Sequence, residues 1–235
     1  RVLVQGPPAG QSPGVEHPWS LTAPPVTGLV DPVRVDPAGK SGPTPGQARG
    51  PGWRYTSAGW VVPATTTDEL VEQRILEAFA GAGPHAVVTG WAGLRLLGGG
   101  FFDGLARDGI TLLPVPIAAN GGRIDPRPGV LLTHDRIPAD EVVSVHGMRC
   151  AIAERSLFDE IRRLGLFEDQ VVASDMAFGG ELTSIRRMRR YRWSRYWYRD
   201  VRRLDRVLPF ASEHARSRPE VDFRLLWVRE VGWLD

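Results

Sequence analysis

Proline and glycine make up 20 of the first 53 residues, including the pairs Pro7-Pro8 and Pro24-Pro25. Proline removes backbone donors and glycine raises the entropy cost of ordering, so helices and sheet ladders are disfavoured there. The composition predicts a long disordered N-terminal tail over residues 1–53, which leaves the fold to the rest of the chain. Two other interpretations stay open: a polyproline II ligand, or non-native sequence from a misassigned start or a shifted frame.

Length and composition exclude several classes of protein. The chain has 235 residues, 42% of them hydrophobic, which suits one or two globular domains. A single cysteine, Cys150, cannot build a disulfide framework or a cysteine-based zinc site, and it favours a cytoplasmic location. No apolar run is long enough for a membrane span, so no membrane partner is expected. Because the first residue is Arg1, we expect a fragment, a processed form or an incomplete reading frame.

The positive charge is almost entirely arginine. Lys40 is the only lysine, which suggests a GC-rich coding sequence and weakens a pI of about 9.0 as evidence for nucleic-acid binding. The net charge is only +2, so only a local cluster of charge could matter.

Hydrophobic periodicity predicts an α+β fold, a small β-sheet flanked by helices. Short apolar runs between turn residues indicate strands at residues 60–62, 112–118, 130–133, 142–146 and 149–152. Apolar stripes indicate a helix from Thr67 or Asp68 to Ala82, then helices at 91–97, 153–164, 168–178, 183–191, 200–208 and from Ser217 onward. Thr89 and Thr183 are the expected caps of the second and fifth helices.

Three segments resemble AbiEi-family antitoxins, the DNA-binding antitoxins of type IV toxin–antitoxin systems. They are residues 88–98 (VTGWAGLRLLG), residues 150–160 (CAIAERSLFDE) and residues 182–188 (LTSIRRM). The resemblance implies an effector domain over residues 54–211, a regulatory role without catalysis, and DNA or a cognate toxin as partner. It implies no cofactor and no metal, and it leaves the oligomeric state open.

Residues 217–226 (SRPEVDFRLL) resemble the start of the very-short-patch-repair-type endonuclease domain that follows this region in actinobacterial relatives. The resemblance therefore makes residues 212–235 the first helix of a truncated endonuclease-like domain. Two departures stand out. The winged helix-turn-helix of the antitoxins is replaced by the proline-rich tail, and the endonuclease domain stops after one helix.

Glu220 is the one candidate catalytic residue, because the endonuclease relatives carry a metal-binding carboxylate on this helix. Such a cluster needs further acidic ligands to hold a divalent ion. Asp222 and Glu230 lie on other faces of the helix, so the site is incomplete and this chain alone is expected to be inactive. The alternative is a plain helix N-terminal glutamate that interacts with the helix dipole.

A basic, aromatic stretch is the best nucleic-acid signal in the chain. Guanidinium groups fit phosphates, and the neighbouring Tyr191, Trp193, Tyr196, Trp197 and Tyr198 could stack on bases. The alternative is a solvated arginine face with the aromatics packed in the core. The candidate nucleic-acid-binding residues are Arg186, Arg187, Arg189, Arg190, Arg192, Arg195, Arg199, Arg202 and Arg203, with Arg206 close behind.

Other motifs carry little chemistry. His134-Asp135 resembles a metal phosphohydrolase dyad without its partners, and Cys150 is expected to be a buried small hydrophobe. Three hypotheses remain: an antitoxin-like regulator that binds DNA or a toxin, a fragment of a metal-dependent endonuclease, and an inactive remnant or misannotated reading frame.

Overall fold

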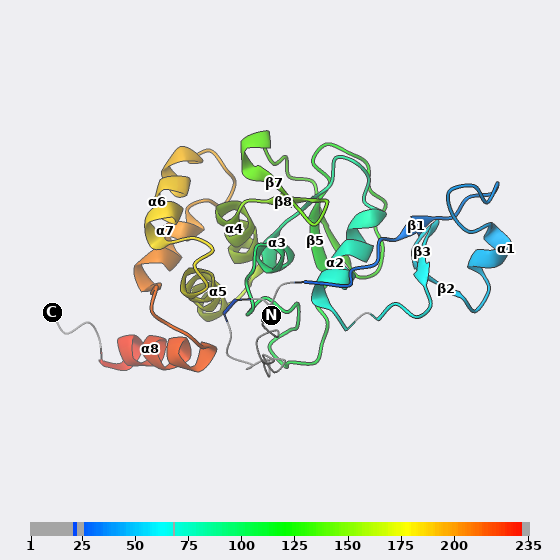
Figure 1. The fold of residues 1–235 in the computed structure, drawn as a ribbon. Coiled ribbons are helices and arrows are strands. Elements are labelled where there is room, and N and C mark those ends of the chain that lie inside the picture. Colours follow the sequence, from blue (N-terminus) through cyan, green and yellow to red (C-terminus); the bar gives the residue numbers. More distant parts are fainter. Residues whose placement is uncertain (1–20, 23–25, 68, 232–235) are drawn as a thin grey trace, which may run out of the picture.

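The computed structural model describes residues 21–22, 26–67 and 69–231, which form two β-sheets and a layer of helices. The smaller sheet lies at one end of the molecule (Figure 1). Its strands are antiparallel, and the turn between the second and third uses Gly59 at φ 76°, a conformation that costs glycine little. In the order β1-β3-β2, the strands are β1 (Val33–Arg34), β3 (Trp60–Pro63) and β2 (Trp53–Ser57).

This sheet corrects the prediction of a disordered tail for residues 33–53. Helix α1 (Pro45–Ala48) places proline in its first turn, where a missing N–H costs nothing, and the Thr44 hydroxyl accepts from the Gln47 amide. The Asp36 carboxylate accepts backbone N–H groups of Ala38 and Lys40 at 2.9 Å and closes a turn. Proline and glycine therefore serve ordered turns here. Residues 1–20 and 23–25 of the predicted tail lie outside the described residues.

The larger sheet has the strand order β6-β5-β4-β8-β7. β4 pairs with β8 and β5 with β6 in parallel, and the remaining neighbours are antiparallel. The strands are β4 (Val87–Val88), β5 (Val115–Ala118), β6 (Val130–Thr133), β7 (Val142–Val145) and β8 (Met148–Ala151). The 3-10 turn η1 (Ala139–Glu141) leads into β7.

Helices α3 (Gly90–Leu96) and α4 (Ala153–Arg163) follow β4 and β8 and pack side by side at the centre of the molecule (Figure 1). Gly93 allows this close approach, since a Cβ there would lie 2.3 Å from the Ser156 Oγ. Gly90 begins α3 at φ 58°, and the next amide, of Trp91, donates to the Glu160 carboxylate at 3.0 Å. Helix α2 (Val71–Ala80) lies between this pair and the smaller sheet.

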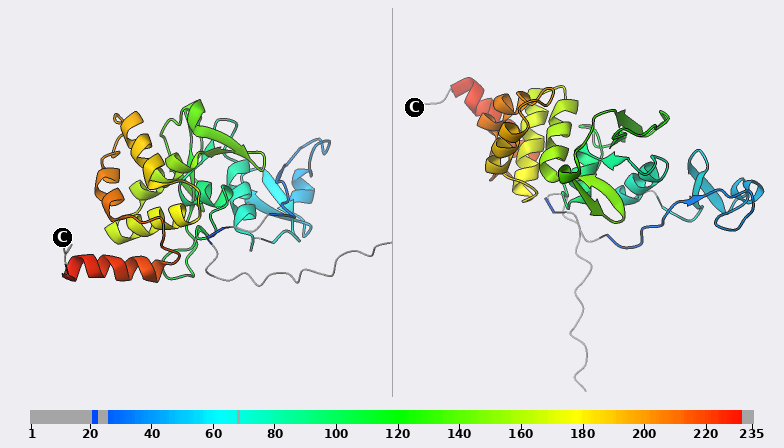
Figure 2. Two further views of the ribbon diagram at one scale, coloured as in Figure 1. Left: turned by 60° about the vertical axis from the view of Figure 1, so that its left-hand side comes forward. Right: turned by 90° about the horizontal axis from the view of Figure 1, so that it is seen from above.

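The remaining helices gather at the end opposite the smaller sheet, as both views in Figure 2 show. They are α5 (Phe167–Gly179), α6 (Ile185–Ser194), α7 (Arg203–Val207), the 3-10 turn η2 (Leu208–Phe210) and α8 (Arg218–Val231). α8 packs on α5 through the fully buried Val221. No helix in the described ranges combines the length and apolar character that a bilayer crossing requires.

The predicted α+β class is confirmed, and one hydrophobic core joins the larger sheet to helices α2–α8 around Trp91 and Phe158. Thr89 occupies the predicted N-cap position of α3, but its hydroxyl donates to Asp159 at 2.6 Å instead of capping the helix. The cap predicted for α6 is wrong, because Ser184 caps that helix while the Thr183 hydroxyl donates to Glu154. Helix α2 begins at Val71, later than predicted from Thr67, and has no side-chain cap; Asp68, the alternative predicted cap, lies outside the described residues.

Candidate nucleic-acid interface

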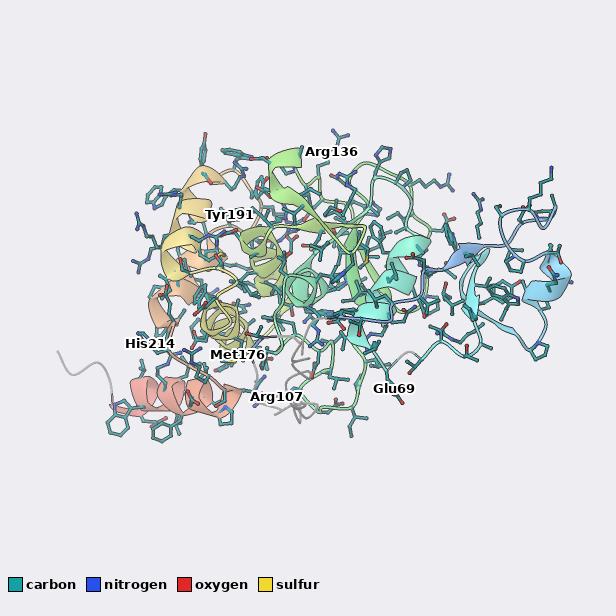
Figure 3. All side chains as sticks on the ribbon, viewed as in Figure 1. Glu69, Arg107, Arg136, Met176, Tyr191 and His214 are labelled. Carbon is teal, nitrogen blue, oxygen red and sulfur yellow. The ribbon has the colours of Figure 1, made fainter. Side chains whose placement is uncertain are left out.

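Helix α6 has an inner and an outer face. Met188 and Tyr191 on the inner face are buried, and Figure 3 shows Tyr191 pointing from α6 toward α4. The spacing of i, i+3 and i+4 places the outer face opposite them, where every side chain is exposed. Its residues are Arg186, Arg189, Arg190 and Trp193. The basic stretch therefore presents one continuous cationic edge to solvent.

Three of the nine predicted arginines are held closely by carboxylates of the protein itself. Arg187 pairs with Glu154 at 2.6 Å, and Arg192 makes a two-pronged contact with Asp205 whose shortest distance is 2.8 Å. Arg195 binds both Asp140 and Glu141. These side chains fasten α6 to α7 and to η1. Each of these three side chains is therefore already engaged within the fold.

The loop and α7 arginines differ among themselves. Arg199 and Arg203 approach Asp200 only loosely, at 3.7 and 3.9 Å. Within the described part of the chain, four exposed arginines of the stretch have no carboxylate partner at all. These are Arg186, Arg189, Arg190 and Arg202, and the same holds for the exposed Arg206, which follows the predicted set.

Charge is concentrated strongly on this segment. Residues 186–206 hold ten arginines and two aspartates, a net +8, in a chain whose total is +2. The other 214 residues therefore carry −6 between them. Codon bias raises arginine content everywhere, but it does not explain this separation of sign. A local field of this kind attracts polyanions even when the whole molecule is nearly neutral.

The aromatic residues of the stretch divide into two groups. Tyr191 and Tyr198 face inward, with Tyr198 stacked on Phe158 at a ring separation of 6.3 Å. Trp193, Tyr196 and Trp197 are 75%, 70% and 60% exposed. The interpretation that all these aromatics pack in the core is therefore wrong for three of five, and the exposed three lie among the arginines.

A hollow of about 510 Å³ opens between α7 and the start of α5. Three arginines line this hollow, and Asp200 is the one carboxylate among its lining residues. The lining residues are Gly165, Phe167, Gln170, Asp200, Arg202, Arg203 and Arg206. Its size and charge suit a phosphate-bearing group.

A buried ionic cluster supports the interface from beneath. Arg155 on α4 contacts Asp159 at 2.9 Å, Asp135 at 3.3 Å and Glu141 at 3.5 Å. The Tyr191 and Tyr198 hydroxyls donate to Glu141 at 3.2 and 3.0 Å. Burial, and then the nearby Glu141 carboxylate, raise the pKa of Tyr198 to about 12, so its phenol keeps the proton that it donates. The cluster ties α4, η1, α6 and the loop after α6 together.

Sequence reasoning missed this cluster. The spacing of Arg155 and Asp159, i and i+4 on one helix, is a signal that could have indicated a paired charge. Glu141 carries no such local signal, because its partners Arg195 and Tyr198 lie more than 50 residues away along the chain.

Glu220 behaves as a helix-terminal residue. Its carboxylate accepts from the Arg216 amide at 3.0 Å and from the Ser217 hydroxyl at 2.9 Å. These hydrogen bonds, the amide first, lower its pKa. Among the described residues, no three His, Cys, Asp or Glu side chains are grouped so that they could hold a metal ion. The contacts of Glu220 therefore match the alternative of a helix N-terminal glutamate.

The remaining candidates also find structural places. Asp135 of the His134-Asp135 pair is engaged by Arg155 and Arg162. Cys150 is fully buried, as predicted, and burial raises the pKa of its thiol to about 12, so it is a poor nucleophile.

Comparison of the chain with protein-family models, curated proteins and solved structures gives no match.

Proposed function

We propose that this chain is a non-catalytic, nucleic-acid-binding regulator that contacts DNA phosphates through α6, α7 and the loop between them. The observation that carries the proposal is the set of five exposed arginines without carboxylate partners in the described residues, inside a segment of net charge +8. These five guanidinium groups are available to bind phosphates, whereas Arg192 and Arg195 are engaged by carboxylates of the protein.

The resemblance to AbiEi-like antitoxins supports the same conclusion, since a transcriptional regulator of that kind acts on DNA. A cytoplasmic location accompanies this proposal. The second candidate, a fragment of an endonuclease, finds no support at Glu220, whose carboxylate accepts hydrogen bonds from Arg216 and Ser217, the two residues directly before α8. A cognate toxin remains the alternative partner that the resemblance implies.

The test measures binding of fluorescein-labelled 30-nucleotide DNA, single-stranded and duplex, by anisotropy over a range of salt concentrations. Each phosphate neutralised on duplex DNA contributes about 0.9 to the slope of log affinity against log salt. Five arginines therefore predict a slope of about −4.5 for the duplex.

The triple variant Arg186→Ala, Arg189→Ala, Arg190→Ala removes the outer face of α6. We expect it to weaken binding at least about tenfold and to reduce the duplex slope by about 3. The control, Arg49→Ala with Arg107→Ala and Arg123→Ala, removes three exposed arginines elsewhere on the molecule. The proposal fails if neither form of DNA binds at low salt, or if the control loses as much affinity as the α6 variant.

A further inference from the structure

Three exposed rings stand at the end of α6 and in the loop that follows it. Trp193 lies under the Arg192 guanidinium, 5.6 Å from its carbon, and Tyr196 and Trp197 meet edge to face at 4.9 Å. Large aromatic side chains are normally buried because they contribute much of the hydrophobic free energy of a core. Three such rings exposed to solvent among arginines indicate a surface that binds a planar chemical group by stacking.

The two loop rings are held by anchored neighbours. Arg195, directly before them, is fixed by Asp140 and Glu141. Tyr198, directly after them, stacks on Phe158 and donates to Glu141 at 3.0 Å. A surface fixed at both ends loses little conformational entropy when it binds, so its contacts contribute more fully to affinity.

A hollow of about 160 Å³ adjoins Trp197. Arg136 and Arg199 are exposed at its rim, and Figure 3 places Arg136 at the edge of the molecule. Arg155, Arg162 and Phe158 form part of its wall. Guanidinium groups beside an aromatic ring offer both a phosphate contact and a stacking surface.

The exposed rings would contact unpaired bases but not the bases of a duplex. In a duplex the faces of the bases are covered by their neighbours, so exposed rings on the protein gain nothing and only the arginines contribute. In a single strand each base face is available, and stacking on one ring is worth a factor of about 5 to 150 in affinity. A protein partner could also bury these rings, but a net +8 segment favours a polyanion over a protein of ordinary charge.

We propose that Trp193, Tyr196 and Trp197 form a stacking platform for unpaired bases, and that the chain therefore prefers single-stranded to duplex DNA. The arginines of α6, the loop and α7 track the phosphates of the same strand. This inference depends on the proposed function, because it specifies the form of nucleic acid that the interface binds.

The test compares the affinity of labelled dT30 with that of a 30-base-pair duplex in the same buffer, by anisotropy. We expect dT30 to bind at least about tenfold more tightly. Trp197→Ala and Trp193→Ala should each weaken dT30 binding about fivefold or more, with little effect on the duplex, whereas Trp197→Phe should retain most of the affinity because it keeps a ring. Both substituted positions, Trp193 and Trp197, are exposed, and circular dichroism checks that the three variants fold.

Trp227→Ala is the matched control, because Trp227 is a tryptophan of α8 that is 57% exposed and lies outside the basic segment. Equal or tighter binding of the duplex overturns the platform, as does an equal loss in Trp227→Ala. Displacement of dT30 by poly-glutamate, with the same dependence on Trp197, would reassign the surface to an acidic protein. Absence of binding to either DNA would instead reject the proposed function itself.

Discussion

At the scale of single residues, Arg155 is the group on which most of the interface depends. Its side chain is 3% exposed and lies between Asp159, Asp135 and Glu141. Removing one partner from a buried ion pair typically costs about 3–5 kcal/mol, because the other charge is left without compensation. We therefore expect Arg155→Met to lower the free energy of unfolding by about 3 kcal/mol or more, measured by urea denaturation.

The pH dependence of this loss of stability tests whether the uncompensated carboxylate of Asp159 causes it. Burial raises the pKa of Asp159 even with Arg155 and Thr89 as partners, so without the guanidinium the carboxyl takes up a proton more readily. The loss should be smaller at pH 5 than at pH 8, because the lower pH favours the neutral carboxyl, which needs no compensating charge. Arg189→Met, on the exposed face of α6, should change stability by no more than about 0.5 kcal/mol. An Arg155→Met loss below about 1 kcal/mol would contradict the role given to the cluster.

At the scale of elements, one buried carboxylate joins α5 to α8. Asp175 is fully buried, accepts from the Ser212 amide at 2.7 Å and pairs with Arg224 of α8. Burial raises the pKa of Asp175 to about 6, and the two hydrogen-bonded partners oppose that rise without cancelling it. The junction is therefore sensitive to the protonation of a single group.

Proton linkage gives the direction in which the free energy of unfolding changes with pH. Because the folded pKa lies above the unfolded one, the folded state binds more protons between about pH 4 and pH 6. The contribution of Asp175 to stability is fully present below pH 4 and is lost as pH rises through 6, by at most about 3 kcal/mol. The difference in unfolding free energy between the wild type and Asp175→Asn, measured by urea denaturation, should therefore favour the wild type more at pH 4.5 than at pH 7.5. A difference that stays constant across this range would show that Asp175 does not titrate there.

Periodicity predicts the long elements well. Helix α4 presents a regular apolar stripe to the core, and α5 has apolar residues at helical spacing although all its residues from Gln170 to Gly179 are buried. It does not predict β4, whose two residues, Val87 and Val88, are too few to alternate. It also misses the order in residues 33–53, where proline and glycine are interpreted as breakers although Pro45 starts a helix and Gly39 makes a turn at φ 64°.

The outer face of α6 could be predicted from the sequence, since Arg186, Arg189 and Arg190 have helical spacing. The sequence does not predict which of the arginines pair with carboxylates. Arg192 finds Asp205 thirteen residues on, and Arg195 finds Glu141 fifty-four residues back, so each pairing depends on the folded chain. The exposure of the three rings could not be predicted either, because the sequence alone does not show that Tyr191 is buried and Trp193 is exposed.

At the scale of the whole molecule, the smaller sheet lies at the end opposite the basic face, which is the surface formed by α6, α7 and the loop between them (Figures 1 and 2). The smaller sheet is fastened to the body chiefly through α2. Arg54 of β2 makes a two-pronged contact with Glu77 at 2.9 and 2.8 Å, and Gln73 exchanges two hydrogen bonds with the backbone of Val30. In the described part of the chain, neither hydrophobic cluster of the body includes a residue of β1, β2 or β3, so the sheet should open locally while the rest of the molecule stays folded.

Amide hydrogen exchange measures this opening directly. We expect Arg54→Ala to speed exchange in β2 and β3 about 5- to 30-fold, the effect of losing about 1–2 kcal/mol, and to leave β4, β5 and β8 protected as before. Arg34→Ala removes an exposed arginine from the same sheet without touching Glu77, and it should leave both sheets unchanged. Faster exchange in both sheets of Arg54→Ala would mean that the molecule unfolds as one unit. Since the basic face shares no contact with Arg54 or Glu77, the affinity of Arg54→Ala for DNA should equal that of the wild type, which separates the stability of the small sheet from the proposed binding role.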